Sequence, residues 1–84
     1  MLYNARMDEL IEQLEIYQLK NKIPQEDLAK KLGVAFSTVN RWFNRRTIPN
    51  KTQQFHILQL IYPGKNDTEY LKEIERIRKQ KGVQ

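Results

Sequence analysis

The chain has 84 residues, no cysteine and a net charge of +5, with 15 Lys and Arg against 10 Asp and Glu. This length allows one small domain. The composition excludes disulfides and thiolate zinc sites, and a single histidine, His56, does not make a metal centre. No apolar run is long enough to span a membrane, and the first ten residues lack the apolar core of a signal peptide.

The first apolar pattern predicts a helix from about Met7 to Lys22. Its inward positions recur at helical spacing, namely Met7, Leu10, Ile11, Leu14 and Tyr17. Ile16 and Leu19 widen this apolar arc. We expect Pro24 to close the helix, because the residue before a proline avoids the α region.

A short second helix is predicted over residues 25–32, with Pro24 suited to be its first residue. Acidic residues in its first turn and lysines in its last turn complement the helix dipole. Its inner stripe consists of Leu28, Ala29 and Leu32. Gly33 follows directly, at the point where a left-handed residue would end the helix.

The third pattern starts at Ala35 or Phe36 and runs to about Arg45. One stripe of this helix holds Val39, Trp42, Phe43 and Arg46. The other stripe, at positions i, i+3, i+4 and i+7, holds Ser37, Asn40, Arg41 and Asn44. Four hydrogen-bonding residues on one helical face, with no acid among them, form an unusual surface.

The positive charge is concentrated in the same part of the chain. Residues 1–40 carry a net charge of −1 and residues 41–84 a net charge of +6. Between Phe36 and Lys51 there are four basic residues and no acidic one. This distribution indicates a polyanion partner, either DNA, RNA or an anionic membrane surface, and the alternative is a solvated basic face with no partner.

Two further helices complete the predicted fold. A fourth helix runs from Lys51 or Thr52 to Ile61, with Phe55, Leu58 and Ile61 facing inward and Ile57 and Leu60 beside them. Asn66 and Glu69 have the spacing of a capping box. They introduce a fifth helix from Asp67 to about Lys79, which has Leu71, Ile74 and Ile77 on one side. Strand patterns are absent, so the predicted fold class is all-α with five helices.

The second and third helices have the layout of a helix-turn-helix, in which two short helices are joined by a tight glycine-containing turn. Relative positions 1, 5, 9, 15 and 18 of this segment are Gln25, Ala29, Gly33, Val39 and Trp42. Ala29 is small because the next helix crosses close above it, and Val39 and Trp42 set the crossing angle. On these residues, the chain resembles the lambda-repressor/Cro-like (XRE-type) helix-turn-helix family over residues 8–61.

Pro49, seven residues beyond Trp42, adds to this resemblance, whereas two positions depart from the family pattern. Phe43 stands where an acid is common, and we expect it to bury apolar area against the C-terminal helix. Arg45 stands where a glycine is common. Without that glycine, Asn44 is the residue that could take a left-handed conformation in the turn.

The resemblance implies an all-α, five-helix lambda-repressor-like domain with the helix-turn-helix at helices two and three. Residues 1–62 would form the core, and residues 63–84 a C-terminal helix of the same domain that packs on the core or dimerises. The implied function is sequence-specific binding of double-stranded DNA by a small transcriptional regulator or a phage or mobile-element protein. Such a protein would act in the cytoplasm, associated with a bacterial or phage-like nucleoid, as a homodimer on paired half-sites. No cofactor, metal or small-molecule ligand is expected.

The resemblance also assigns site residues, because the third helix of this family lies in the major groove. Carried over by position, the base contacts fall on Phe36, Ser37, Asn40 and Arg41. Arg41 suits guanine, Asn40 suits adenine, and Phe36 suits a thymine methyl group. The expected phosphate contacts are Gln25, supported by the amides at the start of its helix, together with Thr38, Asn44, Arg45, Arg46 and Lys51.

Three other interpretations of the sequence remain open. A protein-interaction module, such as an antitoxin or adaptor, would use the fifth helix and the apolar residues Leu2, Tyr3, Met7, Ile16 and Leu19. Trp42 could stack on a single-stranded base, although its spacing from Val39 favours the core. An enzyme is the weakest interpretation, because the chain has one histidine, no cysteine and no glycine-rich phosphate loop.

Overall fold

The structure, a computed structural model, describes residues 5–79. Every regular element in this range is an α-helix: α1 (Ala5–Lys20), α2 (Gln25–Leu32), α3 (Phe36–Phe43), α4 (Lys51–Ile61) and α5 (Asp67–Lys79). The prediction of an all-α fold with five helices is confirmed, and the predicted bounds agree with the observed ones to within two residues. The largest differences are a shift of α1 toward the N-terminus and an earlier end of α3.

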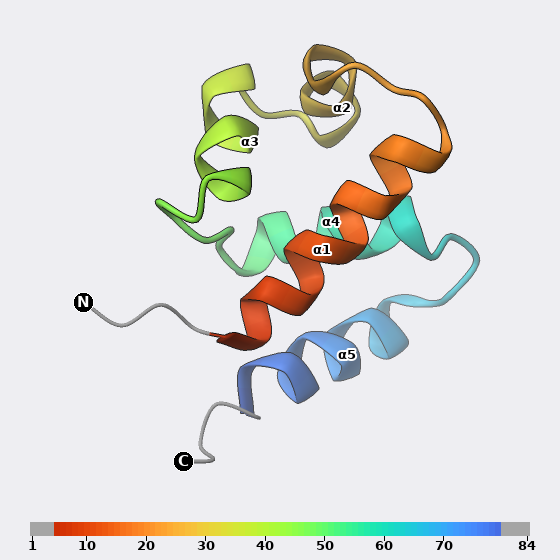
Figure 1. Ribbon diagram of the computed structural model, residues 1–84. Coiled ribbons are helices and arrows are strands. Elements are labelled where there is room, and N and C mark those ends of the chain that lie inside the picture. Colours follow the sequence, from red (N-terminus) through yellow and green to blue (C-terminus); the bar gives the residue numbers. More distant parts are fainter. Residues whose placement is uncertain (1–4, 80–84) are drawn as a thin grey trace.

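The helices pack around α4, which contacts α1, α2 and α5. Helix α1 also packs against α3 and α5, so that α2 and α3 lie on one side of α1 and α5 lies on the other (Figure 1). All five helices contribute to one core, made of Met7, Leu10, Ile11, Leu14, Leu28, Ala29, Leu32, Val39, Trp42, Ile57, Leu58, Tyr70, Ile74 and Ile77. Burial of these apolar side chains is the main force that holds the short helices together.

The helices α1, α2 and α3 end in the same hydrogen-bond motif. The N–H groups of Ile23, Val34 and Arg46 each donate to the carbonyl group five residues earlier, at distances of 3.0, 3.0 and 2.9 Å. This Schellman motif requires a left-handed residue just before the donor. That residue is Lys22 (φ 54°) after α1, Gly33 (φ 71°) after α2 and Arg45 (φ 58°) after α3.

Pro24 plays a different part from the one we predicted. Helix α1 ends at Lys20, through the left-handed turn at Lys22, before the chain reaches Pro24. Pro24 then occupies the N-cap of α2 in an extended conformation, so Gln25 is the first helical residue. The carbonyl group of Pro24 accepts a hydrogen bond from the N–H of Leu28 at 3.0 Å, which closes the first turn of α2.

The buried face of α4 is rotated relative to the prediction. Leu58 is buried as expected, but Phe55 and Ile61 are only half-buried. Ile57, predicted beside the inward residues, and Gln54, which was not predicted to be buried, take the inner positions. The Gln54 side chain is 2% exposed, and its Nε2 donates to the Pro49 carbonyl group at 2.8 Å. A polar residue is tolerated in the core because this hydrogen bond compensates part of its desolvation.

In α5, Tyr70 replaces Leu71 at the inner face. Leu71 is exposed, whereas Tyr70, Ile74 and Ile77 are buried. The Tyr70 hydroxyl group donates to the Tyr62 carbonyl group at 2.7 Å and accepts from the N–H of Lys65 at 3.3 Å. The Tyr70 hydroxyl group is therefore satisfied both as a donor and as an acceptor. A leucine side chain at this position could not bond to the Tyr62 carbonyl group or to the Lys65 N–H.

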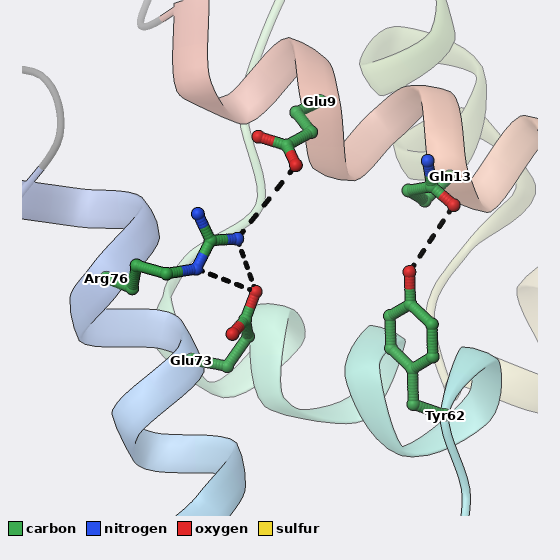
Figure 2. A network of polar contacts seen from close by, with 5 residues as sticks. All are labelled: Glu9, Gln13, Tyr62, Glu73 and Arg76. Carbon is green, nitrogen blue, oxygen red and sulfur yellow. Dashed lines mark hydrogen bonds and ion pairs between the residues drawn. The ribbon is translucent and has the colours of Figure 1, made fainter.

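Helix α5 is also joined to the rest of the domain by polar contacts. The predicted capping box is confirmed, since Glu69 N–H donates to Asn66 Oδ1 at 2.8 Å and Asn66 N–H donates to Glu69 Oε1 at 2.9 Å. Figure 2 shows Arg76 between Glu73 of the same helix and Glu9 of α1, where Nη2 lies 3.9 Å from Glu9 Oε2. The Arg76 guanidinium group, mainly through its hydrogen bond, lowers the pKa of Glu73.

Candidate nucleic-acid interface

Helix α3 has a buried face and an exposed face. On the buried face, Val39 is completely covered and Trp42 is 1% exposed. Trp42 is therefore a core residue, as its spacing predicted, and is not available to stack on a base. The exposed face contains all four predicted base-contact residues, together with Asn44: Phe36, Ser37, Asn40, Arg41 and Asn44.

The turn before α3 sets how this face is presented. Ala29 of α2 is buried where α2 and α3 pack together. Gly33 then takes the predicted left-handed conformation, and α3 begins three residues later. A Cβ atom at Gly33 would meet no atom within 4 Å, so glycine is needed for its backbone conformation and not for space.

Asn44 is directed toward α3 itself. Its Nδ2 donates to the Asn40 carbonyl group at 2.8 Å and to Asn40 Oδ1 at 3.1 Å. These bonds use both N–H donors of the Asn44 amide, and its remaining oxygen is an acceptor, which a phosphate group cannot pair with. The contact fixes the orientation of Asn40, whose Nδ2 donors remain free to point outward.

Arg45 is held against α1. Its Nε lies 2.8 Å from Asp8 Oδ1, and Nη2 lies 3.8 Å from Glu15 Oε1. Its Nη1 donates to the carbonyl groups of Trp42 and Phe43 at 3.4 Å. Arg45 thus links the end of α3 to α1. The sequence had predicted this residue as a phosphate contact.

The left-handed conformation after α3 also falls on Arg45 and not on Asn44. Asn44 has a φ of −93°, whereas Arg45 has a φ of 58°. The chain therefore keeps the left-handed turn at the position where the resembled family commonly has glycine. Phe43, the other departure, is half-buried against the core.

The remaining predicted phosphate contacts are arranged around this face. Arg46 and Lys51 are exposed, like Arg41, and none of the three lies within 4.0 Å of a carboxylate group in residues 5–79. Thr38 and Gln25 are half-buried. The Gln25 Nε2 atom is buried and has no hydrogen-bond acceptor among the described residues.

Other kinds of site find little support in the described part of the chain. His56 is exposed on α4, and no three His, Asp or Glu side chains in residues 5–79 are grouped to hold a metal ion. Over the same range, no helix combines the length and the apolar character needed to cross a membrane.

A comparison with protein-family models gives one match. Residues 14–53 match the family described as Helix-turn-helix, of the XRE/Cro type. The matched segment begins within α1, includes α2 and α3, and ends in the first turn of α4. It contains every predicted base and phosphate contact. Searches of the curated proteins and of the solved structures found no match.

Proposed function

Because residues 14–53 form a helix-turn-helix domain of the XRE/Cro type, which is a DNA-binding and typically non-catalytic domain, we propose that the protein binds double-stranded DNA at specific sequences. In this proposal α3 enters the major groove. The observation that carries it is the exposed, acid-free face of α3. The protein would act in the cytoplasm, on a bacterial or phage-like nucleoid, as a small transcriptional regulator or a mobile-element protein.

The base contacts follow from the chemistry of this face. Arg41 can donate two hydrogen bonds to guanine O6 and N7. Asn40, oriented by Asn44, can donate to adenine N7 and still accept from N6 through its second lone pair. Ser37 can bond to either type of base edge, and the exposed ring of Phe36 can pack on a thymine methyl group.

The proposed phosphate contacts are fewer than the sequence suggests. Arg46 and Lys51 carry free positive charges. Gln25 lies in the first turn of α2, next to its first amides, and its buried Nε2 donor would contact a phosphate group after a change of side-chain rotamer. Thr38 is a further donor on the edge of α3. We leave out Asn44 and Arg45, because the amide donors of Asn44 and the guanidinium group of Arg45 are already used within the protein.

The direct test is selection of bound sequences from a random duplex pool, followed by titration of the selected site. Arg41→Ala should weaken binding by about 5- to 150-fold, and it should relax the preference at one base pair. Lys72→Ala on α5 removes the same charge from an exposed site outside the interface, and it should change binding less than about twofold. If the wild type shows no salt-sensitive binding even at ~50 mM salt, the proposal is wrong.

We also propose that the protein binds paired half-sites as a homodimer. Dimers of helix-turn-helix proteins read two half-sites about 34 Å apart. The selection experiment measures this directly, because a homodimer selects a palindrome. Recovery of single, non-repeated sites would contradict homodimeric binding.

A protein-interaction module is the second candidate function, and the exposed apolar residues of α1 favour it. Ile16 and Leu19 are exposed, whereas Met7, which we had grouped with them, lies in the core; Leu2 and Tyr3 fall outside the described residues. Sedimentation with and without the selected DNA separates the two candidates. A complex that forms without DNA, in a chain that fails to bind duplexes, would favour the interaction module.

A further inference from the structure

The outer face of α1 carries an apolar pair that no other helix in residues 5–79 covers. Leu19 is 75% exposed and is the most exposed large apolar side chain in the described residues, and Ile16, one turn earlier, is 46% exposed. Together with Glu12, Glu15 and Gln18 they line a shallow groove of about 390 Å³. Two adjacent apolar side chains within a polar rim are the usual composition of a contact surface.

Charges are ordered along the same face. Glu12 lies four residues before Ile16, and Lys20 lies four residues after it, so all three share one side of the helix. Glu12 and Lys20 are exposed, and neither forms an ion pair with another described residue. Along the line of Glu12, Ile16 and Lys20 the face is therefore acidic, then apolar, then basic, and Glu15 at the edge of the groove is paired with Arg45 of the same copy.

A surface with this order is complementary to an inverted copy of itself. We propose that α1 pairs antiparallel with α1 of a second copy, about a two-fold axis beside Ile16. In that arrangement each residue a given distance before Ile16 faces the residue the same distance after it in the partner. Glu12 then faces the partner's Lys20 twice, Ile16 packs against the partner's Ile16, and each Leu19 lies one turn away, beside the partner's Ile16.

This pairing deepens the proposed function, since it supplies the contact for binding two half-sites. Helix α1 packs directly against α3, and Arg45 links the end of α3 to Asp8. Pairing of α1 therefore fixes the relative position of the two α3 helices. One helix pair buries less than the roughly 1,200–2,000 Å² of a standard stable interface, so we expect a reversible dimer that neighbouring half-sites strengthen.

The decisive experiment is sedimentation without DNA, over a concentration series, with two charge reversals. The wild type should dimerise, and Glu12→Lys and Lys20→Glu should each be monomeric, because each places like charges opposite each other. An equimolar mixture of the two variants should dimerise. In the mixed pair the two introduced charges are opposite in sign and face each other, and the unchanged Lys20 of one variant faces the unchanged Glu12 of the other. The double variant E12K/K20E should also recover the dimer.

The apolar part of the surface is tested by Leu19→Ser, with Leu71→Ser as the matched control. Leu71 is 41% exposed on α5 and lies outside the proposed contact. Leu19→Ser should abolish association, whereas Leu71→Ser should leave it unchanged. Circular dichroism confirms that each variant is folded, which is expected because all four positions are exposed.

Three results would overturn the proposal: a wild type that stays monomeric at the highest concentration, single reversals that dimerise like the wild type, or a mixture that stays monomeric. Because the association is measured without DNA, it is independent of the proposed function. A wild-type dimer that binds no duplex would contradict DNA binding and support the α1 contact. A monomer that binds one half-site would support DNA binding and contradict the α1 contact.

Discussion

The ends of α2 and α3 have the same backbone geometry but are made from different residues. Both helices close with a hydrogen bond from the residue after a left-handed one to a carbonyl group five residues earlier. After α2 the left-handed residue is Gly33, for which the conformation costs almost nothing. After α3 it is Arg45, for which it costs about 1–2 kcal/mol. The difference shows that side-chain contacts can compensate for an unfavourable backbone conformation.

The compensation at Arg45 comes from contacts that glycine cannot make. The guanidinium group lies 2.8 Å from Asp8 Oδ1 and donates to two carbonyl groups at the end of α3. An ion pair between partly exposed side chains contributes about 0.2–1 kcal/mol. Together with the two hydrogen bonds to carbonyl groups, this contribution offsets a large part of the backbone cost. As a result, the turn before α3 has a left-handed residue that needs no side-chain contact, whereas the left-handed residue of the turn after it is linked to α1.

Trp42→Ala tests whether either turn could hold α3 without the core. We expect a loss of about 3–5 kcal/mol in the free energy of unfolding, because the indole ring is buried in the core beneath α3. Urea denaturation followed by circular dichroism measures this loss. A loss below about 1 kcal/mol would mean that the turns, and not the core, position α3.

Gly33→Ala tests the turn before α3. The added methyl group meets no atom within 4 Å, so the expected loss of about 1–2 kcal/mol is due to backbone conformation alone. The same denaturation experiment measures it. Unchanged stability would show that the left-handed conformation carries no cost here, and the comparison between the two turns would then fail.

Arg45→Ala and Arg45→Gly separate the two contributions at the turn after α3. Both remove the link to Asp8, but only alanine keeps the backbone cost, so we expect the glycine variant to be about 1 kcal/mol more stable than the alanine variant. If the alanine and glycine variants are equally stable, the left-handed conformation at residue 45 has no cost, and the contacts of Arg45 have nothing to compensate.

The same position has a second readout in DNA binding. Because Arg45 is paired with α1, Arg45→Gly should leave the salt dependence of DNA binding unchanged. Arg46→Ala, the matched control at an exposed base, should reduce the salt slope by about 1. A reduced slope for Arg45→Gly would mean that Arg45 leaves Asp8 to contact a phosphate group.

The smallest effect concerns an ion pair that bears no backbone strain, between Glu73 and Arg76 on α5. Arg76 lowers the pKa of Glu73 in the folded state, so the pair stabilises the fold above the ordinary glutamate pKa and loses this effect as the pH falls through the lowered value. Both side chains are partly exposed, so the effect should be below about 1 kcal/mol. Denaturation at neutral and acidic pH should show a smaller pH dependence for Glu73→Gln than for the wild type.

Much of the fold follows from local sequence rules. The bounds of α2 and α5, the left-handed Gly33 and the Asn66–Glu69 capping box all depend on residues close in sequence, and all are confirmed. Lys22 and Arg45 could not be recognised as left-handed, because neither residue type favours that conformation. The inner faces of α4 and α5 were misplaced because Gln54 and Tyr70 are polar, and only their carbonyl partners make burial acceptable.

In the candidate site, too, the features set by residues close in sequence were predicted, and those set by contacts with distant residues were not. Helical periodicity alone places Ser37, Asn40 and Arg41 on one exposed face, and the structure places them there. The contacts of Arg45 depend on Asp8, which belongs to a distant part of the chain and becomes a neighbour only when α1 packs against α3. Sequence rules therefore identify the residues that face the solvent, but not the cations that are already paired.

The contact between α1 and α5 has a consequence for how the protein is made. The apolar face of α1 is completed by Ile74 and Ile77, which lie in the last helix. Roughly 60 residues separate the end of α1 from the end of α5, and at ~5–20 residues per second their synthesis takes about 3–12 s. During that interval the first helix exists without its final partner, so the nascent chain depends on whatever shields that apolar face until α5 has emerged.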